Sequence, residues 1–96
     1  MNIVGRDKLD AFCKEHADGR RAVEAWLAEA EAATWATPQH IKDRYASVSF
    51  LGRNAVIFNI KGNDYRLETI VAYRTGVVVI EWIGTHAEYD ARRRRR

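Results

Sequence analysis

The hydrophobic residues in the first half of the chain recur at the spacing of amphipathic helices. The stretch "ADG" separates two such stripes, and Asp18 is suited to cap the second helix, which should end near Ala33. Thr37 followed by Pro38 has the pattern of an N-cap and first helical position, which predicts a short third helix near residues 38–45. The stripe residues are Leu9, Phe12, Cys13 and His16, then Val23, Trp26, Leu27 and Ala30.

The second half has the composition and alternation of β-strands. Three segments rich in β-branched and aromatic residues, "AVIFNI", "YRLETIVAY" and "VVVIEWIG", are separated by the turn sequences "KGND" and "RTG". They predict a three-stranded antiparallel meander, and "NIV" at residues 2–4 is a candidate for a short N-terminal strand. We therefore expect an α+β fold in which about three N-terminal helices pack on one face of a small antiparallel sheet.

The turn between the first two strands sets their pairing. A two-residue loop at Gly62 and Asn63 is a common hairpin connection, and it places Asn59 opposite Arg66. Because side chains alternate between the two faces of a sheet, one face becomes apolar and should meet the helices. This core face carries Val56, Phe58, Ile60, Tyr65, Leu67 and Val71, and the polar face carries Ile57, Asn59, Lys61, Asp64, Arg66 and Glu68.

We expect the second hairpin to have a two-residue loop as well, which pairs Val71 with Ile80 and keeps Glu81 on the polar face. The same pairing places Arg66 opposite Thr85, and cross-strand neighbours lie about 5 Å apart at Cβ. The polar face therefore has a centre, where Asn59, Arg66 and the "TH" at the end of the last strand should converge.

The segment "THAEYD" at residues 85–90 has two interpretations. Thr85 and Glu88 have the spacing of a capping box, which predicts the start of a short C-terminal helix and requires no function. In that helix His86 and Tyr89 lie on one face, and an imidazole in this position can serve as a general base. Both interpretations stay open on the residues alone.

The cations of the polar face are equally ambiguous. Arg66 is either a solvated side chain paired with a nearby carboxylate or a bidentate ligand for phosphate. Lys61 is either a turn lysine that favours solubility or a second phosphate ligand. Trp26, Trp35 and Trp82 are expected to be core residues.

The net charge of +3 comes from the arginines at 92–96, because without them the chain carries 11 Lys and Arg against 13 Asp and Glu. No broad cationic surface is expected, so any phosphate site must be local. We expect a single domain over residues 1–91 and a disordered tail over residues 92–96. The tail arginines are either solvated or in contact with phosphates.

A chain of 96 residues builds one domain with a modest core. Cys13 is the lone cysteine, the first residues are charged, and no apolar run approaches the roughly 18 residues of a membrane span. These features predict a cytoplasmic protein with no membrane partner. The sequence contains no CxxC, HExxH, P-loop or GxGxxG motif, so we expect neither a metal nor another cofactor.

Two motifs resemble one known family. "FNIKGNDYRL" at residues 58–67 and "WIGTHAEYD" at residues 82–90 are similar to the HigB toxins of bacterial HigB/HigA toxin-antitoxin modules, and "MNIVGRDKLDAF" and "EAWLAEAEAATW" extend the similarity. The resemblance implies a RelE-like fold and an endoribonuclease that cleaves mRNA, typically on the translating ribosome. It also implies a HigA-type helix-turn-helix antitoxin that neutralises the toxin and represses the operon, so DNA is contacted only indirectly, through that complex.

The resemblance also implies a set of site residues. The matching positions are Asn59, Lys61, Gly62, Asn63, Tyr65 and Arg66 in the first motif, and Thr85, His86, Glu88, Tyr89 and Asp90 in the second. The hypothesis is metal-independent attack of an RNA 2′-hydroxyl on the adjacent phosphate. His86 would be the acid or base, Arg66 the phosphate cation, and Tyr89 a stacking or proton-donating partner. The residues expected to bind RNA or its phosphates are Asn59, Lys61, Asn63, Arg92 and Arg93.

Two other hypotheses fit the same residues. One is a catalytically silent member of the fold that only binds RNA or its antitoxin. The other is a small domain whose polar face is merely solvated. Product ends discriminate between them, because a 2′,3′-cyclic phosphate or 3′-phosphate supports the enzyme and intact RNA with retained binding supports the module.

Overall fold

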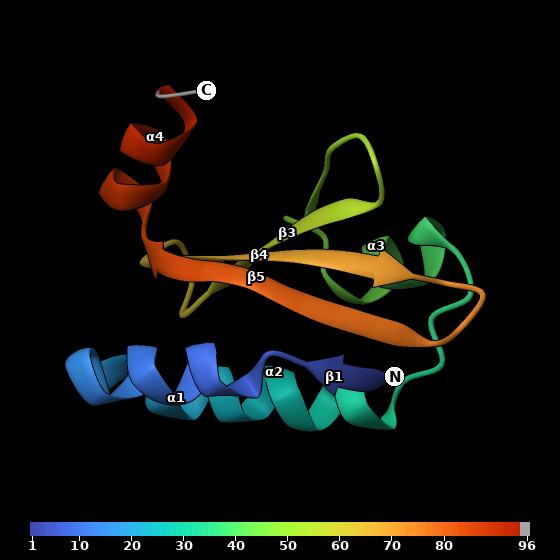
Figure 1. Ribbon diagram of the computed structural model, residues 1–96, viewed down its shortest axis with the longest axis horizontal. Coiled ribbons are helices and arrows are strands. Elements are labelled where there is room, and N and C mark those ends of the chain that lie inside the picture. Colours follow the sequence, from blue (N-terminus) through green and yellow to red (C-terminus); the bar gives the residue numbers. More distant parts are fainter. Residues whose placement is uncertain (95–96) are drawn as a thin grey trace.

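The computed structural model describes residues 1–94, which form one five-stranded sheet with helices on both faces (Figure 1). This α+β arrangement confirms the predicted fold class. The elements are β1 (Asn2–Val4), α1 (Arg6–Glu15), a 3-10 turn (Ala17–Gly19), α2 (Arg20–Ala32), α3 (Pro38–Arg44), β2 (Ser49–Phe50), β3 (Ala55–Ile60), β4 (Tyr65–Ala72), β5 (Val77–Thr85) and α4 (His86–Arg94). None of the helices in residues 1–94 has the length and apolar character needed to cross a membrane.

The sheet is mixed, which corrects the expectation of an antiparallel one. Its strand order is β1-β5-β4-β3-β2, and β3, β4 and β5 form the predicted antiparallel meander. Strand β1 confirms the predicted N-terminal strand, but it pairs with β5 in parallel, with Asn2 opposite Val77. Strand β2 was not predicted, because two exposed residues are too few to show an alternating pattern.

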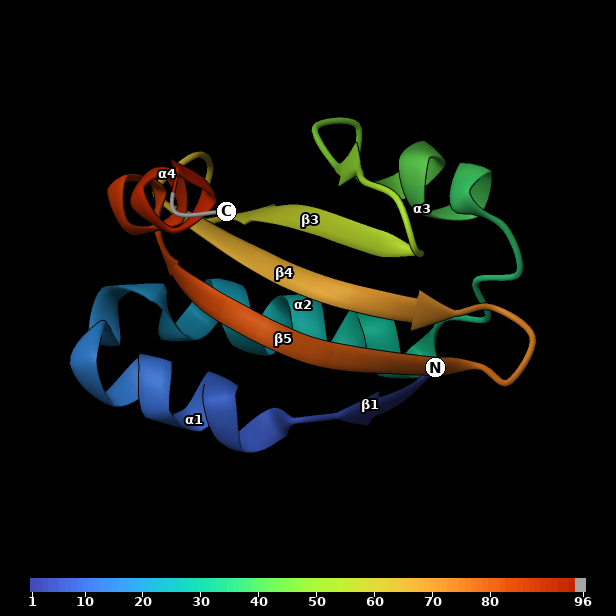
Figure 2. The ribbon, with the colours of Figure 1, turned by 45° about the horizontal axis from the view of Figure 1, so that its top comes forward.

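Helices α1 and α2 cover one face of the sheet, as expected (Figures 1 and 2). The ring of Phe58 is buried in the core under α2, with ring centroids of Trp26 at 5.2 Å, Tyr45 at 5.2 Å and Trp35 at 5.9 Å. Trp26 and Trp35 are therefore core residues, as predicted. Helix α3 begins at Pro38, as predicted.

Asp18 does not cap α2, contrary to the prediction. The 3-10 turn before α2 makes Gly19 the cap residue, and the Asp18 carboxylate points instead toward the β3–β4 hairpin. There it accepts hydrogen bonds from the Tyr65 hydroxyl at 2.7 Å and from Lys61 Nζ at 2.9 Å. The carboxylate thus joins the helical layer to the hairpin.

This arrangement predicts a pH-dependent contribution to stability. The hydrogen bonds from Tyr65 and from Lys61 hold the pKa of Asp18 below its usual value. A carboxyl group whose pKa is lower in the folded than in the unfolded chain stabilises the fold above the unfolded pKa, and that stabilisation is lost as pH falls through the folded pKa. We expect Asp18→Asn to lower the melting temperature at pH 7 and to have a smaller effect at about pH 3, which is below the ordinary aspartate pKa of about 3.9. Thermal unfolding at both pH values tests this, and an equal effect at both would contradict it.

The first hairpin has the predicted register. Asn59 lies opposite Arg66 and Ile60 opposite Tyr65. Gly62 has a φ of 63°, in the left-handed region that favours glycine, which the tight turn requires. The polar and core faces of β3 and β4 are therefore assigned as expected.

The predicted register of the second hairpin is wrong. Val71 lies opposite Val78 rather than Ile80, because the connection comprises residues 73–76 instead of two residues. The Gly76 amide donates to the Ala72 carbonyl at 2.9 Å, and Gly76 has a φ of 71°. This wider turn shifts the pairing of β5 by two residues.

A β-bulge at Glu81 then changes the register again. Thr69 pairs with Ile80 but Glu68 pairs with Trp82, so β5 carries one extra residue at this point. The bulge moves Trp82 off the core face, which corrects its assignment as a core residue, and brings Ile83 into contact with the core instead. From Trp82 to the end of β5, every side chain therefore lies on the opposite face of the sheet from the one predicted.

Helix α4 lies on the face of the sheet opposite α1 and α2 (Figure 1). It continues to Arg94, although the sequence predicted a disordered tail from Arg92. Arginine has a high helix propensity, and positive charge is favourable at a helix C-terminus. The rest of the predicted tail, residues 95 and 96, lies outside the described residues.

Candidate active site

The site lies where β5 passes directly into α4. The predicted capping box closes this junction: the Thr85 amide donates to Glu88 Oε1 at 2.8 Å, and the Glu88 amide donates to Thr85 Oγ1 at 3.1 Å. Two free amides at the start of the helix are thereby satisfied. The box holds His86, the first residue of α4, at the edge of the polar face.

Arg66 and His86 are brought together across the sheet. Arg66 lies on β4 opposite Gly84, one residue away from the predicted partner Thr85, and its Nε donates to His86 Nε2 at 3.1 Å. Both side chains are half-buried. Because Nε2 accepts this hydrogen bond, a neutral imidazole carries its proton on Nδ1. The predicted proximity of Arg66 and His86 is confirmed, through a different register in which Thr85 pairs with Tyr65.

Tyr89 completes a cluster around the guanidinium of Arg66. The tyrosine is 6% exposed, and Arg66 Cζ lies 5.0 Å from its ring centroid. Trp82 packs at 6.0 Å between ring centroids, and Arg93 Cζ lies 5.9 Å from the tyrosine ring. The ring is thus surrounded by protein groups, which leaves little of it open for stacking on a base.

The other predicted RNA ligands do not join this cluster. Lys61 forms ion pairs with Asp18 at 2.9 Å and with Asp64 at 3.7 Å. Asn59 lies beside Arg66 in the ladder, but its amide donates to the Ser47 carbonyl at 3.2 Å and its Oδ1 is buried. Asn63 lies exposed in the hairpin turn. The first motif therefore contributes Arg66 to the cluster, and its other polar residues point elsewhere.

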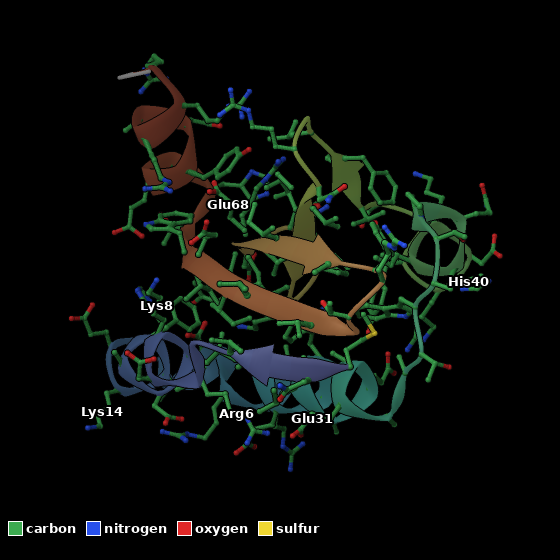
Figure 3. The ribbon with its side chains drawn as sticks, turned by 45° about the vertical axis from the view of Figure 1, so that its right-hand side comes forward. Arg6, Lys8, Lys14, Glu31, His40 and Glu68 are labelled. Carbon is green, nitrogen blue, oxygen red and sulfur yellow. The ribbon has the colours of Figure 1, made fainter. Side chains whose placement is uncertain are left out.

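Two residues of this region were not predicted as functional. Glu68 lies beneath α4 on the polar face (Figure 3), with its side chain only 9% exposed, and pairs with Arg92 Nη2 at 3.2 Å. Trp82 lies on the same face after the bulge, with Arg92 Cζ 5.4 Å from its ring centroid. No sequence pattern marks either residue as functional, because the position of Trp82 depends on the bulge and the cover over Glu68 depends on the path of α4.

Gly84 is required by this packing. An added Cβ would lie 2.6 Å from Trp82 Cζ2 and 2.7 Å from Glu88 Oε1. We expect Gly84→Ala to lower the free energy of unfolding by about 1–3 kcal/mol, because the rigid indole must move. Gly52→Ala is the matched control, since its Cβ would meet no atom within 4 Å. Urea denaturation measures both, and equal stability of the two variants would refute the close contact.

A separate open groove of about 800 Å³ lies between α1, the end of β5 and α4. Lys8 reaches across it from α1 (Figure 3) and donates to the carbonyls of Ile80 and Glu81, each at 3.3 Å. The charged side chains of its lining have both signs, with Glu15, Glu81 and Glu88 against Lys8 and Arg92, whereas Arg66 and His86 do not line it. Because the carboxylates outnumber these cations, the groove is not the better candidate for RNA.

The Arg66 cluster can support acid-base chemistry on an anion. It places a permanently charged fork beside an imidazole that can take up a proton, with an aromatic ring behind both. Among residues 1–94, no group of three or more His, Cys, Asp or Glu side chains could hold a metal ion.

Comparison with known families agrees with this architecture. The model of the HigB toxin family, the RelE-like toxic component of a toxin-antitoxin system, matches residues 19–92. The chain therefore belongs to the HigB toxin family, and its partner in such a system is an antitoxin. No curated protein matches the sequence.

Proposed function

We propose that this protein is an endoribonuclease that inhibits translation by cleaving mRNA on the translating ribosome. The observation that carries the proposal is the hydrogen bond between Arg66 and His86 at the N-terminus of α4, in a chain of the HigB family. A cation joined to an acid-base group fits phosphodiester cleavage by an internal nucleophile.

In the proposed reaction, the 2′-hydroxyl of a ribose attacks the adjacent phosphorus, and His86 Nε2 accepts the hydroxyl proton. This nitrogen must first exchange its hydrogen bond from Arg66 for one from the ribose. The guanidinium has five N–H donors in a planar fork, so Arg66 can turn toward the phosphate and bind its non-bridging oxygens. The substrate phosphate would thus free the base that activates the attack.

The 5′-oxygen needs a proton to leave. We propose that the newly protonated His86 donates it. The products are a 2′,3′-cyclic phosphate and a 5′-hydroxyl. Because the Tyr89 ring is almost fully buried, we assign it to holding the Arg66 guanidinium rather than to stacking on a base.

Electrostatics favour a docked substrate over free RNA. Without residues 92–96 the chain has more acidic than basic groups, so its affinity for a bare RNA strand should be low. We propose that the ribosome presents the mRNA, and that Arg93, in the last turn of α4, adds local attraction. A cytoplasmic location and a HigA-type antitoxin complete the proposal.

The test is expression from a tightly controlled promoter in bacteria, followed by mapping of mRNA 5′ ends. We expect growth arrest with new ends inside translated regions for the unaltered chain and for Arg74→Ala, which removes an exposed arginine of the β4–β5 turn. The Arg66→Ala and His86→Ala variants, if folded, should cause neither growth arrest nor new mRNA ends. Healthy growth with uncut mRNA, at confirmed soluble expression of the unaltered chain, would favour the silent binding module.

A further inference from the structure

We infer that Glu68, Trp82 and Arg92 form an anchor that positions helix α4, and through it the catalytic pair Arg66 and His86. This anchor lies two turns along the helix from His86 and does not touch the proposed scissile phosphate. The inference rests on the proposed function for its catalytic consequence, but its structural part can be tested without activity.

Helix α4 needs such an anchor because it is short. It spans nine residues, His86–Arg94, and an isolated helix of this length is marginal in water. The capping box holds only its first turn. Tyr89 is buried in the second turn, and Arg92 is the next residue that reaches back to the sheet.

The ion pair of the anchor has one nearly buried partner. Glu68 is 9% exposed and Arg92 is 32% exposed in their side chains, and Arg92 Nη2 lies 3.2 Å from Glu68 Oε2. A carboxylate that is so little exposed gains stability from a positive partner, and removal of one partner of a buried pair is costly. Arg92 is such a partner and comes from α4, so the pair ties the end of the helix to the middle of β4.

Trp82 connects the anchor with the catalytic cluster. Its ring lies 5.4 Å from Arg92 Cζ and 6.0 Å from the Tyr89 ring. The Tyr89 ring in turn lies 5.0 Å from Arg66 Cζ, and Arg66 donates to His86. A displacement of α4 at Arg92 would therefore move the ring against which the Arg66 guanidinium rests.

This assignment differs from a phosphate-binding role for Arg92, which was one of the two interpretations of the tail arginines from the sequence. A phosphate ligand contributes to substrate binding and to its salt dependence, whereas a positioning residue contributes to the rate of the bound complex. The two roles also differ toward Glu68. Removal of Glu68 would release a phosphate-binding arginine for RNA, but it would disable an anchor.

The experiment compares Arg92→Ala, Glu68→Ala and the double variant in cleavage of a ribosome-bound mRNA, with Arg74→Ala as the control for loss of one positive charge. We expect each single variant to lower kcat roughly 10- to 100-fold with little change in KM. The double variant should be no slower than the slower single variant, because both substitutions remove the pair of Arg92 with Glu68. Arg92→Lys should recover part of the rate.

The salt dependence of RNA binding distinguishes an anchor from a phosphate ligand. The slope of log affinity for RNA against log salt concentration should be the same for Arg92→Ala as for the unaltered chain. A phosphate ligand would reduce the slope by about 0.7 and raise KM at unchanged kcat, and that outcome would overturn the anchor. Additive losses in the double variant would overturn it as well. If Glu68→Ala fails to fold, Arg92→Ala and Arg92→Lys still decide between the two roles.

Amide hydrogen exchange separates failure of the anchor from failure of the proposed function. In Arg92→Ala the amides of Tyr89 and its neighbours in α4 should exchange at least about tenfold faster, while those of β4 stay protected. This holds even if the unaltered chain cleaves no RNA, in which case only the proposed function fails. Unchanged exchange in α4 would overturn the anchor whatever the activity.

Discussion

Replacement of His86 by alanine should lower RNA cleavage by roughly 10²- to 10⁴-fold, which is the usual contribution of a positioned acid-base group. The imidazole is the proposed acceptor of the 2′-hydroxyl proton and the proposed donor to the 5′-oxygen. Both proton transfers would therefore be lost in the variant. Single-turnover cleavage of ribosome-bound mRNA measures the chemical step directly. A folded His86→Ala that cleaves at the unaltered rate would remove histidine from the mechanism.

His40→Ala is the matched control for this variant. His40 is exposed at the start of α3, where its Nδ1 accepts a hydrogen bond from the Ala36 amide at 3.1 Å. Loss of this imidazole should leave cleavage unchanged, because α3 and the catalytic cluster lie in different parts of the fold (Figure 2). Circular dichroism and the melting temperature show whether each variant is folded.

Arg66→Ala should lower kcat by roughly 10²- to 10³-fold, the effect typical of removing a group that stabilises transition-state charge. Arg66→Lys should recover only part of this loss. Lysine keeps the positive charge, but it lacks the planar fork that binds two phosphate oxygens and the Nε that orients His86. Rates measured at saturating substrate separate this effect from weaker binding.

The combined variant of Arg66 and His86 distinguishes a coupled pair from two independent contributions. If the arginine acts partly by orienting the imidazole, the double variant should be only slightly slower than His86→Ala alone. Fully additive losses would show that Arg66 acts on phosphate without help from the hydrogen bond. Arg74→Ala again controls for the loss of one positive charge.

The second hairpin shows why part of the fold was not predictable. A two-residue shift of register leaves every side chain of a strand on the same face, so the hydrophobic pattern cannot distinguish Val71 opposite Ile80 from Val71 opposite Val78. The turn decides between them, and "YRTG" is compatible with either length. The bulge at Glu81 then recovers one of the two residues, which is why Arg66 still lies close to His86.

The bulge also explains the misassigned tryptophan. Continuous alternation along β5 would place Trp82 in the core, whereas one extra residue turns it to the polar face and places Ile83 against the core. Once Trp82 lies beside Glu68, α4 can cover both. The prediction of disorder was wrong at residues 92–94 for a related reason, since Arg92 contacts Glu68 and Trp82, two residues far from it in the sequence, and the bulge is what places Trp82 there.

The sequence alone determined most of the elements and the three residues at the centre of the candidate site, Arg66, His86 and Tyr89. Local signals suffice for the periodicity of α1 and α2, the start of α3 at Pro38, the first hairpin and the capping box at Thr85, because each depends on residues a few positions apart. The tertiary structure decided the parallel pairing of β1, the register of β5, the ion pair of Lys61 with Asp18 and the path of α4. Those features depend on contacts between distant segments, whose free energies compete with local preferences and leave no periodic pattern in the chain.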